Sequence, residues 1–537
     1  MLQILDSFRI SYGGRPLLLT IAVVLLLAFT AGVVPHARST VLWQRATLLA
    51  VVVAGFTGLL AYLSLVAWYA ADAHFFDNAE PTIVSVAWIY QMGAPLYHGV
   101  DSAERYAHIY GPMVFMAHGA ALKIFGPSIE VSKWLGAFAG FASLGFVFGA
   151  VKQHCSVSRA AALTGGCALL LLLFRHYTFW TRPDSLQLLC AAMALYFAAA
   201  HRSRSSSILV GVASGVLWNL KFTGPLYSFP VFALVHRRFG APAAGLALAT
   251  ALLVAIAPFL LPNVSLNNYL GWVRLSGQTG LLLSLLRQNL EWAAFLTLPI
   301  LLARLLSGRH VDRESDHREI RGALGLGLTL VVIAASKPGA GPYHLIPFVP
   351  VVVYLVAESV QRRPLQVTGS LTAQAAVAYV IVLGVLGMAQ SAQLVRTMGP
   401  RRALHEVDDI RRFLATHTGR VDMAYGQTEA LSLERPELTF RSNSYLIDQP
   451  AIREYQLEGL ALPPQTIEAV RHCRVNYWLV PKGERPFSGI NSYAAVFVKP
   501  LYPAALQEAF TASHRLAEQT EYYDVWKCMG PGTTSDR

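Results

Sequence analysis

TLLAVVVAGFTGLLAYLSLVAWYA, residues 47–70, is an apolar run long enough to cross a membrane as a helix. The chain then changes character, because residues 72–112 read DAHFFDNAEPTIVSVAWIYQMGAPLYHGVDSAERYAHIYGP and carry five carboxylates among many aromatic side chains. Carboxylates beside a bilayer are costly and are usually solvated or functional. A loop this long and acidic is more typical of an active-site rim than of a connector.

The composition indicates a membrane protein. Hydrophobic residues make up 54% of the 537 residues and charged residues only 14%, whereas soluble domains carry about 25% charged residues. Mean hydropathy is +0.44. Apolar runs of spanning length recur from Leu17 to Gln390, which predicts a polytopic protein. We expect the first run, residues 17–34, to be a span, because it is too long for a signal-peptide core and lacks a small-residue cleavage site.

Twelve apolar segments are expected to form spans, which puts the number of spans at about 11–13. They are residues 17–34, 47–70, 129–151, 157–175, 184–200, 206–220, 224–236, 240–262, 281–306, 321–336, 343–360 and 369–390. A further apolar run, residues 111–126, is broken by His118 and Lys123. It is expected either to span or to lie half-sunk in the membrane interface.

Loop charge predicts the orientation of the spans. Short basic loops, such as residues 152–159 and 200–207, alternate with loops of another character, such as the acidic loop 71–111. Basic loops stay in the cytoplasm, so loop 71–111 is expected to be extracytoplasmic. The amino terminus would then also lie outside, although its Arg9 and Arg15 favour the opposite side. Because most basic residues behind the net charge of +12 lie in these loops, the charge does not indicate nucleic-acid binding.

The character of the chain changes again after Gln390. We expect a membrane domain over residues 1–399 and a small extracytoplasmic α/β domain over residues 400–537. In this tail, RALHEVDDIRRFLATH and PPQTIEAVRHC read as helices, while VDMAYG and NYWLVPKG read as short buried strands that end at Gly. The chain as a whole is therefore expected to be a polytopic α-helical membrane protein with an α/β tail.

Five cysteines are scattered along the chain, without the spacing of a metal site. Cys473 precedes the expected strand 476–480, and Cys528 ends the expected strand 522–527. If these strands are neighbours in one sheet, the two thiols can come within disulfide range, and an oxidising compartment would preserve the bond. The alternative is two unpaired, buried cysteines.

Four sequence features resemble the GT-C glycosyltransferases, which include the protein mannosyltransferases and the bacterial aminoarabinose transferases of lipid A. The first outer loop contains the Asp-x-x-Glu of FFDNAEP, followed by GAPLYHG and YGPM. TRPDS precedes one span, and SKPGAGPYHLIPFVP opens a late one. The resemblance covers residues 50–390 and the presence of an outer tail domain.

This resemblance implies an inverting transfer of a sugar from a polyprenyl-phosphate donor to a glycan, lipid or protein acceptor. It implies a multi-pass protein of the bacterial inner membrane with an extracytoplasmic site, surrounded by membrane lipids and without nucleic acid. No cofactor or metal ligand is assigned, although Asp and Glu are ligand types that Mg²⁺ and Mn²⁺ accept. The alternative function is a transporter or flippase of lipid-linked sugars, a class that tends to show internal repeats and midplane ionisable residues.

The transfer needs a general base, and Asp77 is the candidate by resemblance. Pro81 is expected at the first helical position, which puts Glu80 near the N-cap and makes it a second catalytic candidate. Alternatively, Asp77 and Glu80 only cap the helix. Asp72 is expected to be a solvated residue at a span end. Asp184 would orient the acceptor or assist the base, or else it caps a helix or pairs with Arg182.

Binding of the donor phosphate calls for cations at the membrane boundary. Lys337, Arg182 and Lys221 are the candidates, with snorkelling at the interface as the alternative. His344 could reach the phosphate or serve as a structural hydrogen-bonder. The loop residues assigned to substrate binding are Tyr97, Arg105 and Tyr110, although aromatic side chains in a loop also pack on the loop itself.

Overall fold

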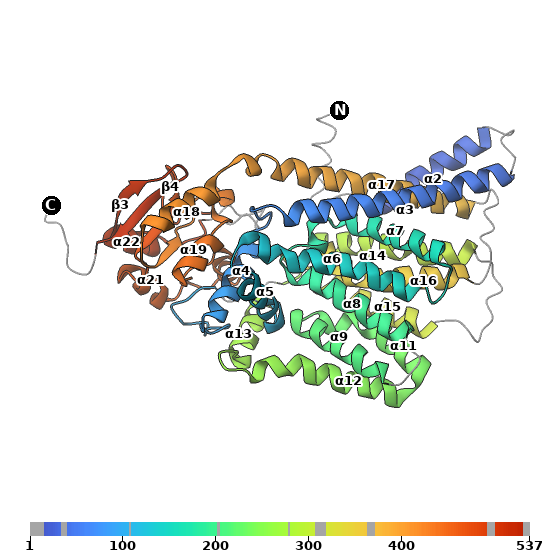
Figure 1. The fold of residues 1–537 in the computed structure, drawn as a ribbon, viewed down its shortest axis with the longest axis horizontal. Coiled ribbons are helices and arrows are strands. Elements are labelled where there is room, and N and C mark those ends of the chain that lie inside the picture. Colours follow the sequence, from blue (N-terminus) through green and yellow to red (C-terminus); the bar gives the residue numbers. More distant parts are fainter. Residues whose placement is uncertain are drawn as a thin grey trace. The chain divides into compact units, whose positions relative to one another are not determined.

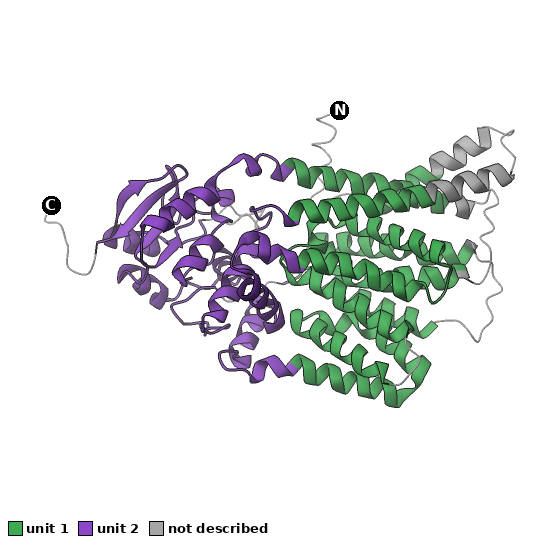
Figure 2. Ribbon diagram, in the orientation of Figure 1, with its two compact units in different colours: residues 1–69, 136–255, 281–396 green, residues 70–135, 256–280, 397–537 purple. Residues whose placement is uncertain are grey.

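A computed structural model describes residues 16–33, 40–106, 109–200, 205–277, 280–306, 318–361, 371–490 and 500–529. Arg9 and Arg15, which bear on the side of the amino terminus, lie outside the described residues. The chain forms two compact units (Figure 2). Unit 1 comprises residues 1–69, 136–255 and 281–396, and unit 2 comprises residues 70–135, 256–280 and 397–537. The predicted boundary between residues 399 and 400 stays a prediction.

Unit 1 is built from helices that run side by side (Figure 1). The helices with all or most of their length in it are α2 Pro16–Val33, α3 Thr40–Ala70, α6 Ile129–Val151, α7 Val157–Leu173, η1 Arg175–Thr178, α8 Pro183–Ala200, α9 Ser206–Leu220, α10 Gly224–Tyr227, α11 Phe229–Phe239, α12 Ala241–Ile256, α14 Leu283–Leu306, α15 Arg318–Ala334, η4 Pro342–Phe348, α16 Val349–Gln361 and α17 Leu371–Met398. The described part of each of the twelve predicted segments is mostly helical, and that all twelve cross the membrane stays a prediction.

Six helical segments of the described chain are long and apolar enough to cross a membrane. They are Val52–Ala70, Ile129–Val151, Pro183–Ala200, Ala241–Leu260, Pro342–Val360 and Gln374–Thr416. Three apolar helices are shorter, namely Pro112–Phe125, Val157–Leu173 and Ser206–Leu220. The predicted segment 224–236 is divided into α10 and α11, with Pro225 and Pro230 each in the first turn of its helix. Proline is tolerated there because the first amides of a helix have no partner within it.

Small residues let helices of unit 1 approach closely. A Cβ atom placed on Gly165 in α7 would lie only 2.5 Å from the carbonyl carbon of Gly55 in α3. A side chain at Gly165 would therefore force the two backbones apart. Contacts through small residues are the usual means of packing helices in a membrane, where apolar surface gains little by leaving lipid.

Unit 2 contains a four-stranded mixed sheet with the order β1-β2-β4-β3 (Figure 1). The strands are β1 Val421–Met423, β2 Tyr477–Pro481, β3 His514–Gln519 and β4 Tyr523–Cys528. β1 pairs with β2 in parallel, whereas the β2–β4 and β4–β3 pairs are antiparallel. The helices of unit 2 are α4 Ala79–Gln91, α5 Pro112–Phe125, η2 Ala257–Leu260, α13 Leu266–Ser276, η5 Arg401–Ala403, α18 Glu406–Thr416, η6 Glu429–Ser432, α19 Pro436–Ser442, α20 Gln449–Leu457, α21 Pro464–Arg471 and α22 Ala504–Ser513.

The tail strands and helices that the sequence predicts are present. α18 and α21 occupy the two predicted helical stretches, and β1, β2 and β4 occupy the predicted strands. β3 was not predicted, because it reads HRLAEQ and buries only its first residue. An edge strand with such a polar sequence lacks the alternation by which a strand is recognised. The core on which the sheet packs includes Trp478, Phe487 and Phe510.

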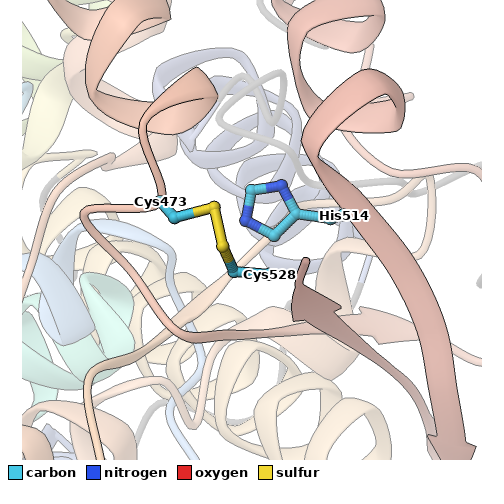
Figure 3. Close-up of side chains that lie close together, drawn as sticks. All are labelled: Cys473, His514 and Cys528. Carbon is cyan, nitrogen blue, oxygen red and sulfur yellow. A yellow bond between two sulfur atoms is a disulfide. The ribbon is translucent and has the colours of Figure 1, made fainter. Parts of the chain in front are cut away.

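Cys473 and Cys528 form a disulfide, as the neighbouring-strand argument predicts (Figure 3). Their Cα atoms are 5.7 Å apart, and β2 and β4 are adjacent in the sheet. The imidazole of His514 lies beside the bond, and the three side chains offer ligand atoms within 4.8 Å of one another. Both sulfur atoms are committed to the disulfide, so in this oxidised state the three residues do not form a metal site.

Candidate active-site residues

Asp77 lies at the entrance to α4. Its Oδ1 accepts a hydrogen bond of 2.8 Å from the backbone N–H of Ala79, and the N–H of Asp77 points back to Oε1 of Glu80 at 3.4 Å. This reciprocal arrangement starts the helix at Ala79, two residues before the predicted start at Pro81. The helix therefore starts earlier than predicted, but Glu80 still lies near the N-cap, in the first turn after Asn78. Asp77 stays partly exposed, whereas Glu80 is fully buried.

The remainder of α4 is buried on nearly every side, from Ala79 to Ala87 and at Ile89. Such burial fits an ordinary core helix better than a helix that lies in the membrane interface. Asp77 therefore lies at the start of a helix that is packed within unit 2.

Asp72 is buried and ion-paired, which corrects the expectation of a solvated residue. Its side chain is 3% exposed. Oδ1 accepts hydrogen bonds from the backbone N–H and ring Nδ1 of His74, at 3.1 and 2.8 Å, and Oδ2 accepts one of 2.7 Å from Arg402 Nε. Burial alone would raise the pKa of Asp72, but His74, Lys133 and Arg402 together hold it below the usual value.

His74 is the centre of this charged group. Burial would lower the pKa of its imidazole, but hydrogen bonds to Asp72 and Glu406, with the charge of Glu434 nearby, raise it to about 9. The imidazole is therefore protonated at neutral pH. Its Nε2 lies 3.6 Å from an oxygen of Glu406, and Arg401 pairs with Glu434 at 2.6 Å. Asp72 thus belongs to a structural network of ion pairs that joins loop 71–111 to the first helices of the tail.

Two of the loop residues assigned to substrate binding are joined to each other. The hydroxyl of Tyr97 donates a hydrogen bond of 2.6 Å to the backbone carbonyl of Tyr110, and the ring of Tyr97 lies 5.2 Å from that of Tyr269. Both tyrosines are buried. Their contacts support the reading in which the loop aromatics pack on unit 2 itself, and a contact with substrate stays a prediction.

Arg105 fastens loop 71–111 to the tail. Its buried guanidinium donates to the carbonyl of Val100 and to the hydroxyl of Tyr455, both at 2.6 Å. Its backbone N–H donates to the carbonyl of Leu446, and its own carbonyl accepts from Asp448 N–H. These contacts give Arg105 a structural task, and the predicted substrate contact remains a prediction.

Asp184, Arg182 and Lys221 come together in unit 1. Asp184 lies in the first turn of α8, and its Oδ1 is 3.0 Å from Nζ of Lys221, which directly follows α9. The guanidinium of Arg182 stacks 4.1 Å from the centre of the Trp180 ring and donates to the hydroxyl of Tyr343 at 3.4 Å. The sequence anticipated Arg182 as the partner of Asp184, but the ion pair in the structure is with Lys221.

Lys337 and His344 complete this cluster. Lys337 is half-buried after α15 and lies close enough to Lys221 and His344 to repel positive charge on both. His344 is buried with its ring 4.5 Å from that of Tyr343, and its Nδ1 has no hydrogen-bond partner among the described residues. Three basic side chains therefore stand around one carboxylate, an excess of positive charge that an anionic group would neutralise.

The aromatic residues that surround this cluster were only weakly indicated by the sequence. Tyr343 stacks on Tyr177 with the rings 4.9 Å apart and nearly parallel. Trp180 lies edge-on to both rings. The concentration of aromatic residues in the stretch before TRPDS was visible, but its pairing with Tyr343 joins residues far apart in the chain.

Residues 110–261, which include Arg182, Asp184 and Lys221, match the family described as dolichyl-phosphate-mannose-protein mannosyltransferase, PMT_2. This match covers less than a third of the chain. The sequence-based resemblance to the GT-C enzymes is thereby confirmed. No functionally curated protein sequence matches the chain.

A solved structure supports the fold. ArnT from Cupriavidus metallidurans in the apo state is 12% identical, with a TM-score of 0.50, over 90% of this chain and 98% of that one. Its structure bound to undecaprenyl phosphate gives 12% identity and a TM-score of 0.49, over 89% and 97%. The Archaeoglobus fulgidus oligosaccharyltransferase is also similar, at 12% identity and a TM-score of 0.42, over 81% and 69%. The chain is a multi-pass membrane protein with an ArnT-like GT-C fold.

Proposed function

We propose that this protein transfers a sugar from a polyprenyl-phosphate donor to an acceptor on the extracytoplasmic face of the membrane. The observation that carries the proposal is the surplus of cations around Asp184, of which Arg182 and Lys221 lie within the segment of the PMT_2 family match. Dolichyl phosphate, which the family description names, is a polyprenyl phosphate. A glycan, lipid or protein acceptor is compatible with this chemistry.

Lys337, Lys221 and Arg182 are proposed to bind the donor phosphate, with His344 as a further hydrogen-bonding group. As the bond between the sugar and the phosphate oxygen breaks, its electron pair moves onto the phosphate. Cations that are already in place stabilise that charge without reorganisation. Arg182 is held by stacking on Trp180 and by Tyr343, so its planar donors are oriented before the substrate arrives.

Asp77 is proposed to be the general base. The acceptor hydroxyl or amine attacks the anomeric carbon, the carbon–oxygen bond to phosphate breaks, and the acceptor proton passes to the carboxylate of Asp77. A single displacement of this kind inverts the anomeric configuration. Asp77 suits the role better than its neighbours, because it is partly exposed whereas Asp72 and Glu80 are buried in unit 2. Asp184, paired with Lys221, is proposed to help orient the acceptor.

The test is product formation by the purified protein in proteoliposomes. Undecaprenyl-phosphate donors that carry different single sugars are supplied together with a membrane and envelope extract as acceptor, and released undecaprenyl phosphate is measured by mass spectrometry. A transferase releases the lipid phosphate and labels an acceptor, whereas a transporter or flippase moves the intact donor across the bilayer without releasing it.

Asp77→Asn keeps the shape of the side chain but removes its basicity. We expect turnover to fall at least about 100-fold, the usual contribution of a general base, while the amount of folded protein stays the same. Asp101→Asn is the matched control, because Asp101 is an exposed carboxylate of the same loop. Full activity of Asp77→Asn would remove Asp77 from the mechanism.

A further inference from the structure

An ion pair in the tail is completely buried and reaches the first turn of α4. Nη2 of Arg435 lies 3.0 Å from Oδ1 of Asp448, and the two side chains are 1% and 0% exposed. A buried ion pair gains little over an apolar pair of the same shape, so its stability alone does not explain it. What such a pair can supply is a fixed geometry for the groups that hydrogen-bond to it.

The donors of Arg435 are distributed over two segments of unit 2. Nε donates to the hydroxyl of Tyr445 at 3.0 Å, and Nη1 to the carbonyl of Ser432 at 2.9 Å, so the guanidinium is fixed within the tail. Nη2 then donates to the carbonyl of Asn78 at 2.7 Å and to the hydroxyl of Thr82 at 2.9 Å. The guanidinium of Arg435 thus binds the backbone carbonyl of Asn78, the residue that follows Asp77.

The carboxylate of Asp448 also contacts the first turn of α4. Its Oδ1 accepts a hydrogen bond of 2.8 Å from the hydroxyl of Thr82, and it also accepts one from Tyr445. Its Oδ2 accepts the backbone N–H of Ala451 at 3.2 Å, which caps α20. The start of α20 and the first turn of α4 are therefore held by one carboxylate.

A second contact holds the side chain of Asn78. Its Nδ2 donates to a carboxylate oxygen of Glu429, and the same oxygen lies 3.1 Å from Nη2 of Arg453. Asn78 is thus held through its carbonyl by Arg435 and through its side chain by Glu429. Asp77 precedes Asn78 directly and accepts the N–H of Ala79, so the two residues that follow it in the chain are held in place.

We propose that Arg435 and Asp448 are positioning residues that set the orientation of Asp77 through Asn78 and Thr82. The inference rests on the proposed function, in which Asp77 is the general base. It gives the tail a direct part in the chemistry, because a carboxylate that is displaced by a fraction of a hydrogen-bond length transfers a proton poorly. A misplacement of about 1 Å can cost about 100-fold in rate.

Thr82 offers the cleanest test, because its hydroxyl contacts both charged residues and can be removed with little change of volume. Thr82→Val should lower kcat by at least about 10-fold while KM for the donor stays within about twofold. Thr82→Ser, which keeps the hydroxyl, should restore kcat. Arg435→Lys should behave as Thr82→Val does, whereas Arg441→Lys, at an exposed position of helix α19, which follows Arg435, should match the unaltered protein.

A double-mutant cycle separates positioning from general structural damage. If Thr82 acts through Asp77, then Thr82→Val should cause no further loss of kcat in the Asp77→Asn background. Multiplication of the two effects, or an unchanged kcat in Thr82→Val, would overturn the inference.

Hydrogen exchange at the amides of Ala79 and Glu80 tests, without any activity measurement, whether Arg435 and Asp448 hold the start of α4. Faster exchange in Thr82→Val, with the exchange of β2 unchanged, supports it, and unchanged exchange at these amides overturns it. Full activity of Asp77→Asn would instead overturn the general-base assignment, so the two failures are distinguishable.

Discussion

Nζ of Lys221 lies 3.0 Å from Oδ1 of Asp184, although the two residues are 37 positions apart in the chain. The distance is short and both side chains are buried, so each neutralises the other. Arg182 and Lys337 add two positive charges that Asp184 alone does not balance. The net charge of the cluster is therefore positive, and removal of Lys221 would do more than weaken a phosphate contact, because it would leave a buried carboxylate without its partner.

Lys337 is consequently the better residue with which to test donor binding. It is half-buried and follows the end of α15. A hydrogen bond to a charged group contributes about 1.5–3 kcal/mol. Lys337→Ala should therefore weaken donor affinity about 10- to 100-fold and change turnover at saturating donor much less, because the phosphate is charged in the ground state. Isothermal titration with a polyprenyl phosphate measures the affinity.

Lys152→Ala is the matched control for this measurement, because Lys152 is an exposed lysine of unit 1. Equal donor affinity in Lys337→Ala and Lys152→Ala would return Lys337 to the snorkelling interpretation. Loss of turnover without loss of affinity would instead give Lys337 a task in the transition state.

Loop 71–111 and the tail 400–537 are predicted to share the extracytoplasmic side. Ser102→Cys introduces a thiol into that loop, and it should react with a membrane-impermeant thiol reagent in intact cells. Because the positive-inside rule is a statistical bias, direct labelling is the decisive measurement. Reaction only after lysis would reverse the orientation and remove the proposed extracytoplasmic transfer with it.

The accuracy of the sequence predictions follows the range of the interactions behind them. An apolar run such as residues 129–151 must be helical in a bilayer, because its backbone groups have no other partners there. The helix from Ile129 to Val151 matches it residue for residue. β3 has no comparable signal, since its place at the sheet edge is given by pairing with β4 and by little else.

The candidate site was predictable only in its residue types. The sequence shows carboxylate residues in loop 71–111 and lysine and arginine residues near the span ends. The structure places Arg182, Asp184 and Lys221 together. The burial of Asp72 was not visible, because its partner Arg402 lies 330 residues away. The same holds for Arg435 and Asn78, which are 357 residues apart. Pairs at such separations are set by tertiary packing, which no local pattern records.

The charged network around His74 predicts a pH dependence of stability. The pKa of His74 is about 9 in the folded protein against 6.5 for the unperturbed side chain. The folded state therefore binds the proton more tightly, and the stabilisation is complete below about pH 6.5 and is lost as the pH rises through about 9. Burial raises the pKa of Glu434 to about 7, so its protonation also stabilises the folded state, and this contribution is lost as the pH rises through about 7.

The measurement is thermal unfolding in detergent between pH 6 and about 9.5. The midpoint should fall over this range in the unaltered protein, and His74→Gln should show a lower midpoint at pH 6 and a flatter profile above about pH 7. His472→Gln is the control, because His472 is exposed at the end of α21. Identical profiles for the two variants would mean that His74 is not the group that titrates.

The disulfide between Cys473 and Cys528 should stabilise the tail by restricting its unfolded chain. The two residues are 55 positions apart, and a closed loop of that length contributes on the order of 4 kcal/mol in the chain-entropy model. Mass spectrometry of the non-reduced protein should find no free thiol at either position. The double substitution Cys473→Ser and Cys528→Ser should lower the unfolding midpoint of the tail, and a free-thiol mass at both positions in the unaltered protein would reject the bond.

The same double variant connects tail stability with catalysis. Arg435 and Asp448 belong to the tail, and they hold the turn that carries Asp77. Well below its unfolding midpoint the tail still folds without the disulfide, so kcat should be unchanged at low temperature and should fall earlier on heating than in the unaltered protein. The contacts of Arg435 and Asp448 with the first turn of α4 require only a folded tail. A loss of kcat at low temperature with the tail still folded would therefore show that the disulfide itself shapes the site.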